Sequence, residues 1–126
     1  MPGSTVLIDL EVDAELRTPR VVRRLLAKEL AGRPFLDDLL LCVSEVVTNA
    51  VLHARPPIRV SAHSDGHGTT RVEVGDGSAQ EPERRNVDHR SPSGRGLHLV
   101  DQLATRWGVD VRKDGKTVWF EFVGDD

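Results

Sequence analysis

The 126-residue sequence predicts an α/β domain with two layers, a mixed five-stranded sheet carrying three helices on one face. Two kinds of apolar pattern favour this class. Some segments alternate apolar and polar residues, as half-buried strands do, and others place apolar residues every three to four positions, as helices do. The chain shows no internal repeat and no linker, so we expect residues 1–126 to form a single domain.

The first half of the chain is expected to supply one strand and two helices. Apolar residues alternate over 6–12, which predicts a strand with one apolar face. Thr18-Pro19 is typical of a helix start and Gly32 of a helix end, and an apolar stripe lies between them. A longer apolar stripe from Leu36 to about His53 predicts the second helix.

Two strands and a long irregular segment follow. Alternation over 58–62 and 70–76 predicts two strands, joined by a glycine-containing turn at 65–68. Residues 77–93 have no periodicity and contain two prolines and many charges. A stretch of this length without periodicity is typical of a functional or mobile loop.

The last part of the chain predicts a helix and a hairpin. Gly94-Arg95-Gly96 opens the third helix, which we expect to end at Trp107-Gly108. Strands are expected over 109–112 and 117–123. Asp114-Gly115 between them is a strong hairpin signal.

Composition excludes several classes of protein. The chain is 38% hydrophobic and 29% charged, with a net charge of −3, which argues against a general nucleic-acid binder. The longest uncharged apolar stretch, residues 39–43, is far too short to span a membrane. No basic residue precedes the first apolar run, which argues against a secretory signal. Cys42 is the only cysteine, so no internal disulfide forms, and we expect a cytoplasmic protein.

The second expected helix carries two polar residues suited to chemistry. Glu45 and Asn49 are four positions apart and therefore share a face. A carboxylate can orient or deprotonate a hydroxyl, and an amide oxygen can ligate Mg²⁺. The alternative is a solvated helix face. His53 lies one turn further along, where packing or helix capping is its more ordinary role.

Three further segments each have two interpretations. Asp76 before Gly77 is either a turn former or an acceptor for an exocyclic amine such as that of adenine. Gly94-Arg95-Gly96 is either a flexible lead-in or a helix start whose amides hold phosphates, with Arg95 as a charged clamp. Thr117 by itself indicates only a strand.

The order and spacing of these segments resemble the histidine-kinase-like (GHKL) ATPase superfamily. Residues 45–54 look like its asparagine-box helix, and residues 72–77 look like its adenine-binding aspartate strand. Gly94-Arg95-Gly96-Leu97 resembles its second glycine box, and Gly115-Lys116-Thr117 its final threonine strand. The resemblance covers nearly the whole chain, and it is to the small single-domain anti-sigma-factor serine/threonine kinases of bacteria.

The resemblance implies a Bergerat-type ATP-binding fold, with ATP between the second helix, the third helix and a lid formed by residues 77–93. The implied ligands are ATP and Mg²⁺. Gly77, Arg95 and Leu97 would belong to the nucleotide site. The remaining implied roles are general base for Glu45, Mg²⁺ ligand for Asn49, adenine contact for Asp76, water-mediated support of Asp76 for Thr117, and phosphate cradle for Gly94 and Gly96.

The same resemblance implies an ATP-binding anti-sigma regulatory factor that phosphorylates an antagonist protein and sequesters a sigma factor, as a homodimer, with no direct contact to nucleic acid or membrane. One feature departs from the family. Its first glycine box, Asp-x-Gly-x-Gly, has Ser78 and Gln80 at the two glycine positions here. This departure favours an alternative function, a nucleotide-gated partner-binding switch with little or no kinase activity. A basic helix face (Arg17, Arg20, Arg24 and Lys28) is either a solvated face or a surface for an acidic partner.

Overall fold

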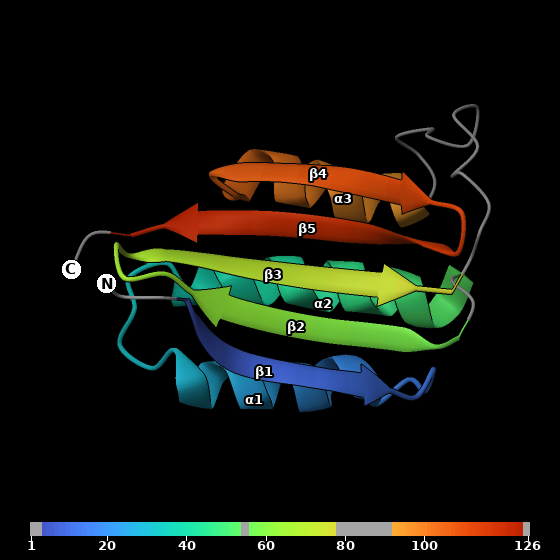
Figure 1. Ribbon diagram of the computed structural model, residues 1–126, viewed down its shortest axis with the longest axis horizontal. Helices are drawn as coiled ribbons and strands as arrows, with labels where there is room; N and C mark the ends of the chain where they lie inside the picture. Colours follow the sequence, from blue (N-terminus) through green and yellow to red (C-terminus); the bar gives the residue numbers. More distant parts are fainter. Residues whose placement is uncertain (1–3, 54–55, 78–91, 125–126) are drawn as a thin grey trace.

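The computed structural model describes residues 4–53, 56–77 and 92–124, with the backbone alone for residues 92–96. All three helices lie on one side of a five-stranded sheet, so the expected two-layer α/β architecture is confirmed (Figure 1). The elements in chain order are β1 (Thr5–Val12), α1 (Thr18–Glu29), α2 (Leu36–His53), β2 (Ile58–Ser64), β3 (Thr69–Asp76), α3 (Pro92–Leu103), β4 (Arg106–Arg112) and β5 (Gly115–Val123).

The sheet has the strand order β1-β2-β3-β5-β4, and every neighbouring pair is antiparallel. The expectation of a mixed sheet was therefore wrong. Two helices separate β1 from β2, so the chain returns in the opposite direction and the two strands pair antiparallel. The single helix α3 makes β4 parallel to β3, but β5 lies between these two strands and pairs antiparallel with both.

Several boundaries differ from the sequence expectation. The helix α3 begins at Pro92, so residues 92–93 of the expected loop are helical. The helix α3 ends at Leu103, and Trp107-Gly108 lies within β4 instead of ending the helix. The Trp107 ring is partly buried against the core, and its indole N–H donates a hydrogen bond to Asp101 Oδ1 at 2.8 Å. A bulky aromatic residue is favoured in a strand that packs on a core. Strand β5 begins at Gly115, two residues earlier than expected.

The core fills the space between the sheet and the helices. Alternate residues of β2, β3 and β5 point into it from one side, and the apolar stripes of α1 and α2 point into it from the other. Each large aliphatic or aromatic side chain buried in this way contributes roughly 1.5–3 kcal/mol to stability. Fully buried members include Val22, Leu26, Leu39, Val43, Val47, Val60, Val72 and Phe120.

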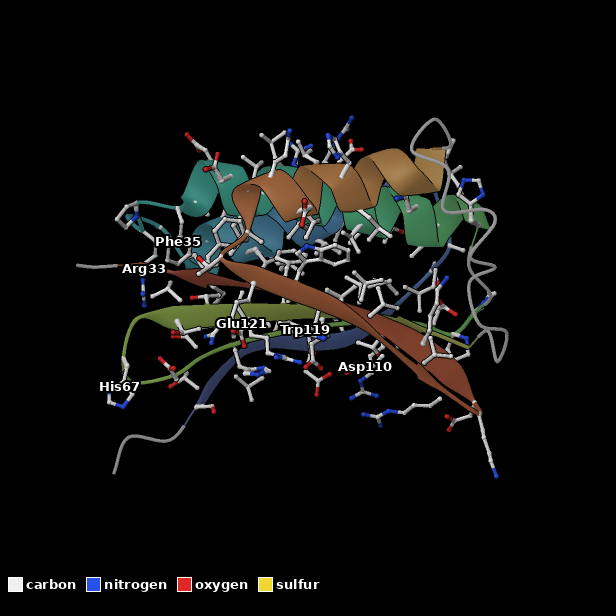
Figure 2. All side chains as sticks on the ribbon, turned by 90° about the horizontal axis from the view of Figure 1, so that it is seen from above. Arg33, Phe35, His67, Asp110, Trp119 and Glu121 are labelled. Carbon is white, nitrogen blue, oxygen red and sulfur yellow. The ribbon has the colours of Figure 1, made fainter. Side chains whose placement is uncertain are left out.

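No described helix covers the other face of the sheet. Asp110, Trp119 and Glu121 lie on this open face, away from the helices (Figure 2). Arg71 binds Glu73 at 2.7 Å and Glu121 at 3.0 Å, and its guanidinium carbon lies 4.1 Å from the centre of the Trp119 ring. Within the described residues, no helix has both the length and the apolar character needed to cross a membrane.

Candidate functional site

Four elements meet at one end of the two layers, the right-hand end of Figure 1. The helix α2 and the strand β3 both end there, and the helix α3 and the strand β5 both begin there. This arrangement follows from the strand directions, because β3 runs toward this end and its antiparallel neighbour β5 starts from it. The order of elements therefore brings together residues that are far apart in the sequence, such as Val46 of α2 and Val118 of β5.

A cleft opens at this end, and side chains of α2, β3, α3 and β5 line it. Its walls are mainly apolar, with a few polar side chains between them, as ligand clefts usually have. The polar lining residues are Asn49, His53, Asp76 and Lys116, and the apolar ones are Val46, Ala50, Val74, Leu97 and Val118.

Asp76 is the most enclosed charged group of the cleft. It is in phase with the buried Val72 and Val74 on β3, so its side chain points toward the helices. That side chain is only 5% exposed. A carboxylate in such a place needs partners, because burying an unpaired charge is costly. Its Oδ2 lies 3.9 Å from Lys116 Nζ. A carboxylate held in an apolar cleft can accept hydrogen bonds from the amine of a bound heterocycle.

Lys116 lines the cleft because β5 pairs with β3. It lies directly opposite Asp76 in the antiparallel register, and directly paired residues project from the same face of a sheet. A Cβ atom added at Gly115 would clash with the carbonyl oxygen of Asp76, so the two backbones pass very close at this point. The sequence reasoning did not select Lys116. Lys116 alternates in phase with Val118, Phe120 and Phe122, but Trp119 in the other phase is apolar as well, so the sequence leaves open which phase faces the core.

Thr117 does not line the cleft. It pairs with Gly75 on the open face of the sheet, and a Cβ atom added at Gly75 would lie 3.3 Å from Thr117 Oγ1. Asp76 projects from the opposite face, so the sheet separates the two side chains. Contrary to the expectation, Thr117 cannot support Asp76 from this position. Side chains alternate along β5, so Lys116, and not Thr117, projects from the same face of the sheet as Asp76.

The helix α2 contributes Asn49 and His53 to the cleft, one turn apart on one face. His53, which the sequence analysis assigned to packing or capping, therefore lies on the cleft wall. Glu45 is one turn before Asn49 and is partly buried, but it is not among the residues lining the cleft. The structure thus brings Asn49 together with Asp76 and leaves Glu45 beside the cleft.

The glycine segments are only partly described. Leu97 of α3 lines the cleft, while Gly94, Arg95 and Gly96 lie in the first turns of that helix, where the structure gives the backbone alone. Gly77 packs against the loop before β2, since a Cβ atom there would lie 2.7 Å from the carbonyl oxygen of Pro56. Of the expected lid, residues 78–91 lie outside the described residues.

The donor set suits Mg²⁺ held jointly with a ligand. In the described part of the chain, no three His, Cys, Asp or Glu side chains gather into a metal site. Asn49 is the amide that lines the cleft. Magnesium commonly takes one or two protein oxygen ligands and completes its shell with phosphate oxygens and water. A single amide oxygen on the wall of this cleft fits this pattern.

Comparison with known families decides the assignment. The sequence model of the histidine kinase-like ATPase domain matches residues 10–122, nearly the whole chain. The chain belongs to the histidine kinase-like ATPase family. Membership implies ATP binding and supports kinase-type use of ATP by this domain. A search of the curated proteins gives no match.

Solved structures agree with this membership. The structure of the RsbU and RsbW domains of Rv1364c from Mycobacterium tuberculosis superposes with a TM-score of 0.72 at 25% identity, covering 93% of this ATPase domain. The histidine kinase domain of the blue-light activated histidine kinase EL346 from Erythrobacter litoralis superposes with a TM-score of 0.55 at 24% identity, covering 70% of our chain. This second likeness supports the fold alone. Our chain covers 31% of the first of these solved chains and 44% of the second.

Proposed function

We propose that this histidine kinase-like ATPase domain binds ATP with Mg²⁺ and acts as a cytoplasmic anti-sigma regulatory factor with protein serine/threonine kinase activity. Its partners would be a sigma factor, which it sequesters as a homodimer, and an antagonist protein, which it phosphorylates. The observation that carries the proposal is the nearly buried Asp76 carboxylate in the same apolar cleft as Asn49. The family membership and the resemblance to the Rv1364c domains support it further.

In the proposed complex the chain positions the nucleotide at three points. Asp76 accepts a hydrogen bond from the exocyclic amine of the base, while apolar side chains such as Val74 and Val118 contact its faces. Asn49 offers its amide oxygen to Mg²⁺. The first turn of α3, which contains Gly94, offers backbone N–H groups that have no partner within the helix, and these favour phosphate.

Glu45 is the proposed general base. When bound, ATP with Mg²⁺ supplies the γ-phosphoryl group and neutralises part of its charge. The Glu45 carboxylate would accept the proton from a serine or threonine hydroxyl of the antagonist as that oxygen bonds to the γ-phosphorus. The bond between this phosphorus and the β–γ bridging oxygen would break, and ADP would leave. Its place beside the cleft, one turn from Asn49, suits a group that meets the protein substrate instead of the nucleotide.

A second candidate function is a nucleotide-gated switch that binds partners with little or no phosphoryl transfer. Two observations favour it. Glu45 does not line the cleft, and the positions of the first glycine box carry Ser78 and Gln80, outside the described residues. In this case the nucleotide would alter partner binding, and Glu45 would have no role in chemistry.

Nucleotide binding is tested by thermal unfolding with and without Mg-ATP. Ligand at about 100 times its dissociation constant stabilises a fold by roughly 2.7 kcal/mol, which raises the Tm of a chain of this length by about 10 °C. Asp76→Asn should lose most of this shift. Asp110→Asn, which changes an exposed aspartate on the open face, is the matched control and should keep it. No shift at millimolar Mg-ATP contradicts the proposal.

Phosphoryl transfer is tested by incubating the protein with Mg-ATP and a candidate antagonist and measuring the antagonist's mass. Removing a positioned base slows transfer by roughly 10²- to 10⁴-fold. We therefore expect Glu45→Ala to lose transfer and keep ATP binding, and Glu29→Ala, at an exposed position on α1, to keep both. Undiminished transfer by Glu45→Ala would refute the base. No transfer by the unaltered protein, with ATP-dependent partner binding, would support the switch.

A further inference from the structure

Lys116 lies on the apolar face of β5, at the end of this strand that lines the cleft. The side chains that share its face, Val118 and Phe120, pack in or against the core. Lys116 is 27% exposed and lines the cleft with Asp76. An ammonium group at a core-facing position loses hydration, so its presence there calls for a partner of opposite charge or a ligand.

The nearest carboxylate does not use the hydrogen-bonding capacity of this ammonium. The 3.9 Å between Lys116 Nζ and Asp76 Oδ2 allows an attraction between charges but exceeds the length of a hydrogen bond. Among the described residues Lys116 donates no hydrogen bond to any other group. Three N–H donors therefore stand at the cleft wall beside a nearly buried acceptor.

The pairing of the two strands places donor and acceptor next to each other. Asp76 and Lys116 are directly paired across β3 and β5, and the two backbones are so close there that a Cβ atom at Gly115 would clash with the Asp76 carbonyl oxygen. The cleft thus presents a carboxylate acceptor and an ammonium donor side by side at one edge.

This pair complements one edge of adenine. The exocyclic amine of adenine is a donor, and the adjacent ring nitrogen N1 is an acceptor. We propose that Lys116 determines base specificity by donating a hydrogen bond to N1, while Asp76 accepts from the exocyclic amine. The inference rests on the proposed ATP-binding function and assigns a residue to the recognition of its base. Guanine presents an acceptor and then a donor at the same two positions, so it would place its oxygen against the Asp76 carboxylate.

The experiment pairs a change in the protein with a change in the ligand. ATP and 1-deaza-ATP, in which N1 is replaced by C–H, are titrated by calorimetry in the presence of Mg²⁺. A hydrogen bond from a charged donor contributes about 1.5–3 kcal/mol, which corresponds to roughly 10- to 150-fold in affinity. We expect the unaltered protein to prefer ATP over 1-deaza-ATP by a factor in this range.

Lys116→Met should remove this preference, because the variant keeps a long apolar side chain and loses the donor. It should bind ATP at least tenfold more weakly and bind both nucleotides equally. Lys113→Met, at the exposed turn between β4 and β5, is the matched control and should keep the full preference. Lys116→Gln retains a neutral donor and serves if the methionine variant does not fold. It should retain a smaller preference than the unaltered protein.

The outcomes separate this inference from the function on which it rests. If the unaltered protein binds neither nucleotide, the proposed ATP-binding function fails and the inference fails with it. If the unaltered protein binds ATP but the Lys116 variants keep its full preference over 1-deaza-ATP, ATP binding stands and the contact to N1 is overturned. Equal binding of the two nucleotides by the unaltered protein also overturns the contact.

Discussion

The close approach of β5 to the end of β3 can be tested by adding one methyl group. Gly115 is buried, and an alanine Cβ there would clash with the Asp76 carbonyl oxygen and lie 3.7 Å from the Gly77 Cα. The obstacle is backbone, which cannot rotate away as a side chain would. In Gly115→Ala the start of β5 must move, or the end of β3 must move with Asp76.

The expected loss of stability follows from this contact. Overpacking by one carbon costs typically 1–3 kcal/mol, and a rigid obstacle places Gly115→Ala near 2–3 kcal/mol. For a chain of this length this corresponds to a Tm lower by about 8–11 °C. Gly32→Ala is the control, because its φ of +87° strains an alanine while its Cβ would meet nothing within 4 Å. Strain of that kind costs about 1–2 kcal/mol.

The measurement is urea unfolding of the three proteins, followed by fluorescence of the two tryptophans. Gly115→Ala should lower the midpoint more than Gly32→Ala, with no change in the dependence of unfolding free energy on urea. A smaller loss for Gly115→Ala than for Gly32→Ala would refute the reasoning, since it would mean that the two strand ends separate without cost.

Three further predictions concern single residues. Thr117→Val should change Mg-ATP affinity by no more than about twofold in calorimetry, because its side chain lies on the open face; a large loss would contradict that placement. Burial, with a smaller effect of Asp38, raises the pKa of the Cys42 thiol to about 12, so a disulfide reagent at pH 8 should react with the folded protein far more slowly than with the protein in urea. Hydrogen bonds from the Thr69 and His67 backbone N–H groups lower the pKa of Asp65 below its usual 3.8. The ionised Asp65 carboxylate therefore stabilises the folded state above pH 3.8, and this contribution is lost as pH falls through the lowered pKa. The unfolding free energy of Asp65→Asn should accordingly fall less steeply in acid than that of the unaltered protein.

The sequence by itself determined the number, type and order of the elements. Period-two patterns in 58–62 and 70–76 and the helical stripe of 36–53 depend on neighbours along the chain, so they can be read without the fold. The helix carrying Asn49 and the strand ending at Asp76 were located in the same way, and the spacing of the motifs indicated the family that the comparison confirmed.

The tertiary structure decided which of these residues meet. The sheet is antiparallel throughout because β5 inserts between β3 and β4, a choice of neighbour that no local pattern records. The sequence predicts a helix end at Trp107, whereas the residue lies in β4 and contacts the core and Asp101. Glu45 and Asn49 share a helix face, yet only Asn49 lines the cleft, because the packing of α2 against the sheet and α3 sets where that face points.

Strand β5 shows most clearly what the sequence determines and what the tertiary structure decides. Lys116 and Thr117 are adjacent, and alternation requires them to lie on opposite faces of the sheet. Val118, Trp119 and Phe120 are all apolar, so the sequence does not show whether Trp119 or its two neighbours face the core. The structure resolves this by pairing Asp76 with Lys116, while the Trp119 ring lies on the open face against the Arg71 guanidinium. Sequence periodicity fixes that a strand alternates, but its pairing with a neighbouring strand decides which side chain enters the cleft.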